Sequence, residues 1–159
     1  MDIKVGMADL NVCSGTDTIT TLGLGSCVGV VLWDAQAKVC GMLHAMLPDS
    51  TSIRNNSNVA KFVDSGIDEL LKRVLAKGAR RQNLVAKIAG GAQMFSVSNK
   101  SDLIAVGKRN AEASVKKLNA LRIPIRAQDT GGSCGRTVTF YPENGQYHIK
   151  CVGKETKII

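Results

Sequence analysis

Apolar residues recur every three or four positions in two stretches of this chain, a spacing that predicts two amphipathic helices. The first helix is expected to follow Asn58, whose side chain suits a helix N-cap, and to end at Gly78. The second is expected over about 106–121, ending before Pro124. The apolar face of the first consists of Phe62, Val63, Ile67, Leu70, Leu71, Val74 and Leu75, and that of the second of Ala111, Val115, Leu118 and Leu121.

Two apolar, β-branched runs at 25–34 and 38–44 predict a β-hairpin. If residues 35–36 alone form the loop, antiparallel pairing places Cys27 directly opposite His44. Directly opposed residues have Cβ atoms roughly 4.5–5.5 Å apart on the same face of the sheet, within reach of a thiol–imidazole contact. A shift by one residue would put the two side chains on opposite faces, so this prediction depends on the loop length.

The remaining apolar runs predict further strands at 84–89, 123–127, 136–140 and 147–152. The last two are expected to pair across a turn, and the first ends at Gly90-Gly91, where the backbone must turn or approach another group closely. Strands that flank two main helices indicate an α+β fold of layered mixed and antiparallel sheets. No linker or repeat divides the chain, so residues 1–159 are expected to form a single domain.

Charge and hydropathy narrow the range of partners. The formal net charge of +8 favours an acidic partner surface, through steering more than through affinity. Nucleic acid is not expected as a partner, because the aromatic residues that would stack on bases make up only 4% of the chain and are not interleaved with the basic ones. The chain has no apolar run near the roughly 20 residues of a membrane span and no cleavable signal at its start, so a cytoplasmic protein without membrane insertion is expected.

The cysteines give no sign of a metal site or a disulfide framework. There are five of them, an odd number, and none has C-x-x-C spacing, so most are expected to be reduced and structural. No His, Asp and Glu cluster suggests a metal either, and the Gly-rich run 23–26 lacks the lysine of a phosphate-binding loop. No cofactor is therefore expected. The five are Cys13, Cys27, Cys40, Cys134 and Cys151.

Cys27 has the setting that a nucleophilic thiol requires. Glycines precede it, so the chain can bend and present backbone N–H groups near the sulfur, as an oxyanion hole demands. His44 is the candidate general base, because the other histidine, His148, has no nucleophile beside it in the sequence. Thr21 is the candidate third group, whose hydroxyl or carbonyl could accept a hydrogen bond from the imidazole and hold its tautomer.

A purely structural interpretation competes with this one. Cys27 could be a small buried hydrophobic residue and His44 a hydrogen-bonded strand residue. Cys40 serves as a contrast, because the same register places it opposite Val31, where it should be inert packing.

Several short motifs occur along the chain, namely Thr21-Leu22-Gly23-Leu24-Gly25-Ser26-Cys27-Val28, His44-Ala45-Met46-Leu47-Pro48, Gly90-Gly91-Ala92-Gln93-Met94, Gly107-Lys108-Arg109-Asn110, Ile123-Pro124-Ile125 and Asp129-Thr130-Gly131-Gly132-Ser133-Cys134-Gly135-Arg136. Taken together, they resemble the CheD family of chemoreceptor glutamine deamidases. Each motif alone is weak, but their order and spacing over nearly the whole chain are specific. Three residues depart from the family pattern, namely Met42 and Leu43 before the histidine and Cys134 in the second Gly-rich turn.

The resemblance implies a cysteine-dependent deamidase with Cys27 as nucleophile, His44 as general base and Thr21 orienting the histidine. It also implies a fold similar to the catalytic domain of cytotoxic necrotizing factor, the cytoplasmic region of methyl-accepting chemoreceptors as substrate, and regulation by the phosphatase CheC. Two alternatives stay open. One is a methylesterase that uses the same Cys-His pair, and the other is a binding regulator of receptors or CheC without turnover.

Overall fold

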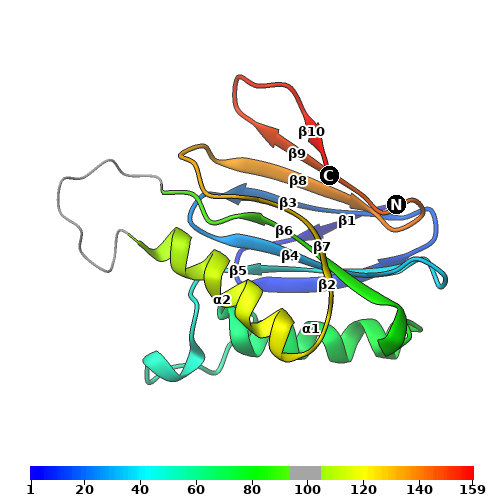
Figure 1. Ribbon diagram of the computed structural model, residues 1–159, viewed down its shortest axis with the longest axis horizontal. Helices are drawn as coiled ribbons and strands as arrows, with labels where there is room; N and C mark the ends of the chain where they lie inside the picture. The colour runs from blue at the N-terminus through cyan, green and yellow to red at the C-terminus, as the bar shows by residue number, and fades with distance from the viewer. Residues whose placement is uncertain (94–104) are drawn as a thin grey trace.

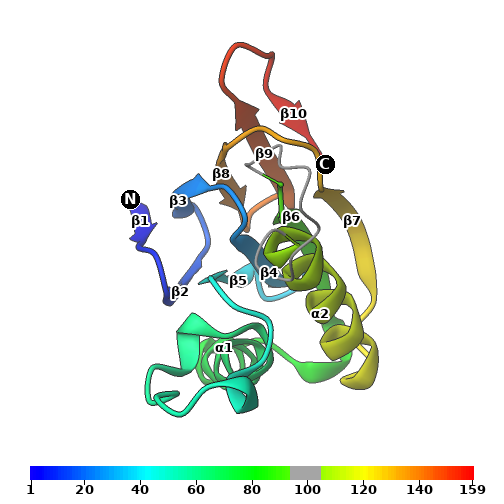
Figure 2. The ribbon, with the colours of Figure 1, turned by 90° about the vertical axis from the view of Figure 1, so that its left-hand side faces the viewer.

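The computed structural model describes residues 1–93 and 105–159, which form three stacked layers (Figure 1). Two five-stranded sheets face each other, and two helices cover the outer face of one of them, as Figure 2 shows from the side. The sheet next to the helices has the order β2-β5-β4-β6-β7, from Asp9–Ser14, Val39–Ala45, Val28–Asp34, Leu84–Gly90 and Ile125–Thr130. The other has the order β1-β3-β8-β9-β10, from Asp2–Val5, Thr18–Leu24, Arg136–Tyr141, Gln146–Cys151 and Lys157–Ile158.

The predicted α+β fold of mixed and antiparallel sheets with two main helices is confirmed. The two helices are α1 (Val63–Lys77) and α2 (Val106–Ala120). Most strand pairs are antiparallel, and β1 with β3 and β6 with β7 are parallel. Three short 3₁₀ helices complete the described part: Ser50–Ser52, Val59–Lys61 and Arg81–Asn83.

Two separate cores follow from the alternation of side chains along β4 and β5. Val30 of β4 and Leu43 of β5 point to the helices, whereas Val31 and Met42 point to the other sheet. The first core is therefore packed between sheet and helices and the second between the two sheets. His44 belongs to the inter-sheet face, because it alternates with Leu43.

The hairpin exists, but the register predicted for it is wrong. Gly29, not Cys27, lies opposite His44. The loop is four residues long because the Asp34 carboxylate accepts hydrogen bonds from the backbone N–H groups of Gln36 (2.9 Å) and Ala37 (3.0 Å), which folds these residues into the turn. The pairing therefore shifts by two residues, which leaves every side chain on its predicted face.

The same shift changes the neighbours of Cys40. It lies opposite Trp33 of β4 rather than Val31, and its other neighbour is Cys13 of β2, with the two sulfur atoms 3.5 Å apart. Cys40 is fully buried.

The helices differ from expectation in detail. Asn58 caps the 3₁₀ helix Val59–Lys61 rather than α1, whereas Gly78 ends α1 as predicted, with φ +124°. The fully buried face of α2 is one residue away from the predicted apolar face, which is half-buried at Ala111 and Val115. Its buried residues are Gly107, Asn110, Ser114 and Leu118.

The sequence pattern predicted no strand before residue 25, yet three precede it, and β10 was also missed. The strand β3 has Thr18, Thr20 and Thr21 among its seven residues, and its hydroxyl groups hydrogen-bond across the sheet, so apolar alternation does not mark it. In residues 1–93 and 105–159, no helix has both the length and the apolar character to cross a membrane.

Candidate active site

Thr21 and His44 meet between the two sheets. Thr21 lies on β3 of one sheet and His44 on β5 of the other, and Thr21 Oγ1 is 2.7 Å from His44 Nδ1. Both residues are buried, with exposed fractions of 1% and 0%. The layered fold therefore brings together two side chains that are 23 positions apart in the chain.

The backbone of β1 fixes the direction of this hydrogen bond. Thr21 Oγ1 also lies 2.7 Å from the carbonyl oxygen of Val5, which can only accept. A hydroxyl has a single hydrogen, so Thr21 donates to Val5 and must accept from His44 Nδ1–H. The neutral imidazole is thereby held as the Nδ1–H tautomer, and its Nε2 is left with a free lone pair.

The free nitrogen of the imidazole is enclosed by the fold. His44 Nε2 is buried without a hydrogen bond to any group in the described part of the chain. Burial lowers the pKa of His44 below its ordinary value, because the charged imidazolium is poorly solvated there. The imidazole is therefore neutral at rest and can accept a proton at Nε2.

Cys27 lies in the same inter-sheet layer, in a bend directly before β4. It is 7% exposed and packs in the core between the sheets. Gly29, two residues further along the chain, is opposite His44, so the alternation of side chains puts Cys27 on the same face of the sheet as the histidine, without a hydrogen bond between the thiol and His44 Nε2. Burial raises the pKa of the Cys27 thiol, and a hydrogen bond from its own backbone amide opposes this rise. The thiol is thus protonated at rest.

The bend at residues 25–27 is held by the turn that follows β6. The backbone N–H of Gly91 donates to the Cys27 carbonyl at 2.8 Å, and that of Ala92 donates to the Gly25 carbonyl at 2.9 Å. Gly90 has φ +105°, and a Cβ built there would lie 2.3 Å from the Cys27 carbonyl oxygen. The close approach predicted for Gly90-Gly91 is therefore made to the residue proposed as nucleophile.

Asn110 of α2 is a further residue at this site, and its place in the motif 107–110 gave no sign of its role. It is fully buried, and its side-chain nitrogen contacts the backbone of the 25–27 bend. A buried asparagine in the middle of a helix is the signal that could have marked it, since the amide must find partners there.

A cavity of about 410 Å³ lies between α2, β7 and the segments that follow β6 and β7. Thr21, Cys27 and His44 are not among its lining residues. Gly91, whose N–H holds the Cys27 carbonyl, is one of its walls. Lys108 and Glu112 of α2 supply charged side chains to its lining.

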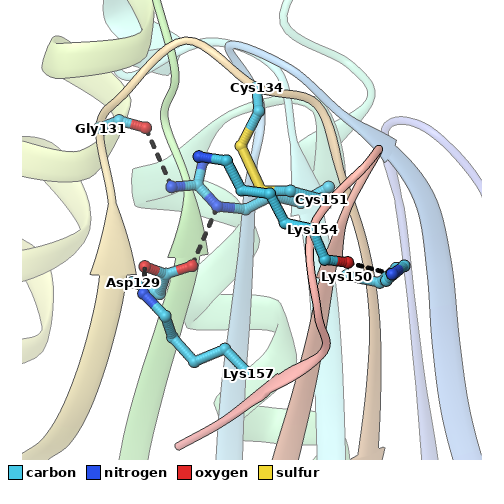
Figure 3. Close-up of a disulfide and its surroundings, with 8 residues drawn as sticks. Asp129, Gly131, Cys134, Lys150, Cys151, Lys154 and Lys157 are labelled. Atoms are coloured by element: carbon cyan, nitrogen blue, oxygen red, sulfur yellow. Dashed lines mark hydrogen bonds and ion pairs between the residues drawn. A yellow bond between two sulfur atoms is a disulfide. The ribbon is translucent and has the colours of Figure 1, made fainter.

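The expectation that the cysteines are mostly reduced holds for three of them, but Cys134 and Cys151 form a disulfide (Figure 3). Cys134 lies two residues before Arg136, which is opposite Cys151 in the hairpin of β8 and β9. The hairpin register therefore brings the two sulfur atoms together, which their spacing along the chain does not reveal.

A charged cluster also holds the segment that connects β7 to β8, in which Cys134 lies. The buried Arg136 guanidinium donates to the Asp129 carboxylate at 3.1 Å and to the Gly131 carbonyl at 2.9 Å, and Lys157 donates to Asp129 at 3.0 Å (Figure 3). Burial works to raise the pKa of Asp129, but hydrogen bonds and charge from Lys157 and Arg136 outweigh it and hold this pKa below its usual range. Gly131 in turn donates to the Gly90 carbonyl at 3.0 Å.

In residues 1–93 and 105–159, no three His, Cys, Asp or Glu side chains gather to hold a metal ion.

A thiol, a histidine and a group that orients the histidine, gathered in one buried layer, form the constellation of enzymes that transfer acyl groups through a cysteine. The family model described as CheD chemotactic sensory transduction matches residues 46–151. The chain belongs to this family.

Relatives extend the match over the whole chain. A protein of Lachnoclostridium phytofermentans, named "Probable chemoreceptor glutamine deamidase CheD", is 64% identical over 157 residues, which are 99% of this chain and 98% of the relative. The chemoreceptor glutamine deamidase CheD of Halalkalibacterium halodurans is 52% identical over 158 residues, again 99% and 98% of the two chains. Among solved structures, the C-terminal domain of CNFy from Yersinia pseudotuberculosis has a TM-score of 0.44 at 11% identity, covering 99% of this chain and 62% of that chain.

Proposed function

We propose that this chain is a protein-glutamine deamidase, which hydrolyses side-chain carboxamides of glutamine residues in methyl-accepting chemoreceptors and leaves glutamate. Family membership supports the substrate class, because relatives at 64% and 52% identity are named as chemoreceptor glutamine deamidases. The single observation that supports the chemistry is the free Nε2 of His44, whose tautomer is set by Thr21. In this proposal Cys27 is the nucleophile, His44 the general base and Thr21 the orienting group.

The first half-reaction forms a thioester. Cys27 Sγ attacks the side-chain carbonyl carbon of the glutamine while His44 Nε2 takes the thiol proton. The Gly25 N–H donates to the Gly23 carbonyl at 3.0 Å, so within the 25–27 bend the N–H groups of Ser26 and Cys27 are the candidates to stabilise the oxyanion that develops on the carbonyl oxygen. The C–N bond then breaks, and ammonia leaves with the proton that His44 returns.

The second half-reaction restores the enzyme. His44 Nε2 accepts a proton from water, and the resulting hydroxide attacks the thioester carbon. The C–S bond breaks, the thiolate regains its proton from His44, and glutamate remains on the substrate. The proton passes through Nε2 in both halves, so a histidine held as the opposite tautomer would be inactive.

The neutral resting pair supports a coupled proton transfer. Burial raises the pKa of Cys27 and lowers that of His44, so both shifts disfavour a thiolate–imidazolium ion pair before substrate binds. The thiol is therefore expected to lose its proton to His44 as it attacks, rather than beforehand.

The wider setting of this enzyme rests on the family resemblance. We propose CheC as its regulatory partner and the cytoplasm as its location, where the signalling regions of chemoreceptors lie. The net charge of +8 is compatible with acidic helices as partners. We also propose that residues 1–159 act as one deamidase domain. A binding titration with purified CheC tests the partner.

Mass spectrometry of a chemoreceptor cytoplasmic fragment tests the reaction and the residues together. Incubation with the unmodified protein should convert specific glutamines to glutamate with release of ammonia. Cys27→Ala should abolish conversion, because no other group replaces the thiol. Thr21→Val keeps the shape of the side chain but cannot accept from Nδ1–H, and should lower kcat about 100-fold or more. Cys40→Ala is the matched control, a buried cysteine of the same hairpin.

The alternatives predict different products. Release of methanol rather than ammonia would indicate a methylesterase with the same pair of residues. Conversion that persists in Cys27→Ala would refute the proposed nucleophile. No conversion by the unmodified protein, with unchanged receptor or CheC binding in Cys27→Ala, would indicate a binding regulator.

A further inference from the structure

We propose that Asn110 is a positioning residue, which fixes the distance between the 25–27 bend and the strand that carries His44. The inference rests on the proposed roles of Cys27 and His44, to which it adds a residue on α2. The hydrogen bonds of the Asn110 amide go to backbone carbonyls rather than to the thiol or the imidazole, so it would act on the reaction through the backbone.

One amide group joins the two segments. The side-chain nitrogen of Asn110 lies 2.9 Å from the Ser26 carbonyl oxygen and 3.0 Å from the Met46 carbonyl oxygen. Ser26 directly precedes Cys27, and Met46 follows His44 by two residues. The nucleophile and the base are therefore tied to the same nitrogen atom, each through a short stretch of backbone.

The chemistry of these contacts allows little substitution. Both neighbours are carbonyl oxygens, so only the NH₂ end of the amide can face them, and both of its hydrogens are used. A carboxylate of the same shape has no hydrogen to donate, and a hydroxyl has only one. Of the side chains with this geometry, asparagine alone bridges two acceptors from this distance.

The other end of the amide argues against a role in stability alone. Asn110 Oδ1 is buried and has no hydrogen-bond partner in the described part of the chain. A buried acceptor without a partner destabilises the folded state. The hydrogen bonds of this side chain in the described part of the chain are therefore the two that its NH₂ group donates to the bend and to the segment after His44.

The packing of α2 on the turn after β6 makes this bridge rigid. A Cβ built on Gly107 would lie 2.2 Å from the Ala92 carbonyl oxygen, so the first turn of the helix packs directly on the turn after β6. That turn donates to the carbonyls of Gly25 and Cys27. The helix thus holds the 25–27 bend twice, through this turn and through Asn110.

Two variants and one control test the proposal in the full-length protein. Asn110→Asp keeps the shape of the side chain and removes the donated hydrogens when ionised. Asn110→Ser is a second variant, which removes the bridge without any change of charge because a hydroxyl has only one hydrogen to donate. Ser114→Ala is the matched control, because Ser114 is equally buried one turn further along α2 and donates only to the Asn110 carbonyl of its own helix.

Two readouts separate positioning from structural support. Steady-state deamidation gives kcat and KM, and we expect kcat to fall about 10- to 100-fold in both variants with KM within about threefold of the unmodified protein. Alkylation of Cys27 by iodoacetamide, read by peptide mass spectrometry without substrate, should slow in parallel at pH 7. Ser114→Ala should keep both rates within about twofold. All measurements are made at least about 10 °C below the Tm of each variant, so that each variant is folded during the assay. This margin is wider than the Tm shift of a typical single substitution, a few °C for a domain of this size.

Each other outcome overturns the proposal. Unchanged kcat and alkylation with a lowered Tm would mean that Asn110 only supports the fold, and failure of both variants to fold would mean the same. A raised KM with unchanged kcat would mean that it acts on substrate binding. The unmodified protein and Cys27→Ala are assayed alongside, so activity that persists without Cys27 refutes the proposed nucleophile separately, while the alkylation rates still report on the position of the bend.

Discussion

The hydrogen of the Thr21 hydroxyl decides how His44 can act. It is donated to the Val5 carbonyl, so the imidazole must donate from Nδ1 and keep Nε2 free. The group that sets the tautomer is therefore a main-chain carbonyl of β1, beyond the side chains usually counted in a catalytic triad. A change that moved β1 would alter the base without touching any of the three proposed residues.

The pH profile of deamidation should reflect the buried histidine. Only neutral His44 accepts the thiol proton, and burial lowers its pKa, so activity is lost as pH falls below the ordinary imidazole value of about 6.5. We expect the acid limb of kcat/KM for ammonia release to be centred below that value. An acid limb centred above pH 7 would contradict the neutral pair and favour a reaction limited by prior ionisation of Cys27.

Sequence reasoning could propose the residues of the site but not their contacts. Cys27 and His44 stand out because of the glycines before one and the scarcity of the other. Their register was misjudged by two residues, because the Asp34 carboxylate enlarges the hairpin loop. The faces nevertheless agreed, since a shift of two preserves the alternation of side chains. The Val5 carbonyl could not be foreseen, because a backbone acceptor leaves no mark in the sequence.

At the scale of elements, the turn after β6 supports the reactive bend. Gly90 combines a left-handed backbone with a close approach to the Cys27 carbonyl, two conditions that only glycine meets without strain. The turn connects outward to Gly131, whose N–H holds the Gly90 carbonyl. Contacts thus run from the loop before β8, through the turn, to the bend.

Gly90→Ala should impair catalysis far more than a similar change elsewhere. Its Cβ would lie 2.3 Å from the Cys27 carbonyl oxygen and must displace the bend. We expect at least a 100-fold loss of kcat, on the order that a misplacement of about 1 Å causes. Gly78→Ala is the control, because Gly78 also has a positive φ, +124°, but no atom lies within 4 Å of its built Cβ.

Gly78→Ala should lower stability by about 1 kcal/mol through backbone strain and keep the activity of the unmodified protein. Urea unfolding and steady-state deamidation measure the two effects. Equal losses of activity in the two variants would show that backbone strain, rather than contact with the bend, impairs Gly90→Ala.

Elements with strong apolar periodicity were predictable and those with polar strands were not. The end of α1, the strand at 84–90 and the hairpin of β8 and β9 all follow from pattern and turn residues. The threonine-rich β3 does not, because its burial comes from the sheet packed above it rather than from its own alternation. The buried face of α2 was misjudged for the same reason, since a small and polar stripe packs on the turn after β6.

At the scale of the molecule, the disulfide anchors the connection between the two sheets. Residues 131–135 lead from β7 of one sheet to β8 of the other, and Cys134 within them is joined to Cys151 at the end of β9. The disulfide thereby fixes residues 131–135 to the sheet that contains β8 and β9, next to the ion pair of Asp129 and Arg136.

Reduction of this disulfide should destabilise the whole molecule. The two cysteines are 17 positions apart, and opening a loop of that size is expected to lower the free energy of unfolding by about 3 kcal/mol. Urea unfolding with and without a phosphine reductant measures the change. A Cys134→Ser, Cys151→Ser double variant serves as the control, because reductant should leave its midpoint unchanged.

Alkylation of the unfolded, unreduced protein checks the premise of that experiment. It should modify three cysteines, Cys13, Cys27 and Cys40, and the remaining two only after reduction. Modification of all five without reductant, or an unchanged unfolding midpoint in reductant, would contradict the prediction.

The layered architecture as a class was predictable, whereas the arrangement of its sheets was not. Two helices and several strands indicate α+β layers, but the order β2-β5-β4-β6-β7 depends on pairings between distant segments that local patterns do not encode. The disulfide could not be predicted for the same reason, because it follows from the register of β8 and β9 rather than from the spacing of the cysteines.

The bridge made by Asn110 also has a consequence for the way the protein is made. Thr21, Cys27 and His44 all lie within the first 46 residues, so they leave the ribosome long before the helix that ties Ser26 to Met46. A nascent chain shorter than 110 residues carries all three side chains without the bridge that spaces them. Premature termination before residue 110 would therefore release fragments that contain every proposed catalytic group but lack the bridge and the strands β7 to β10 that complete the fold.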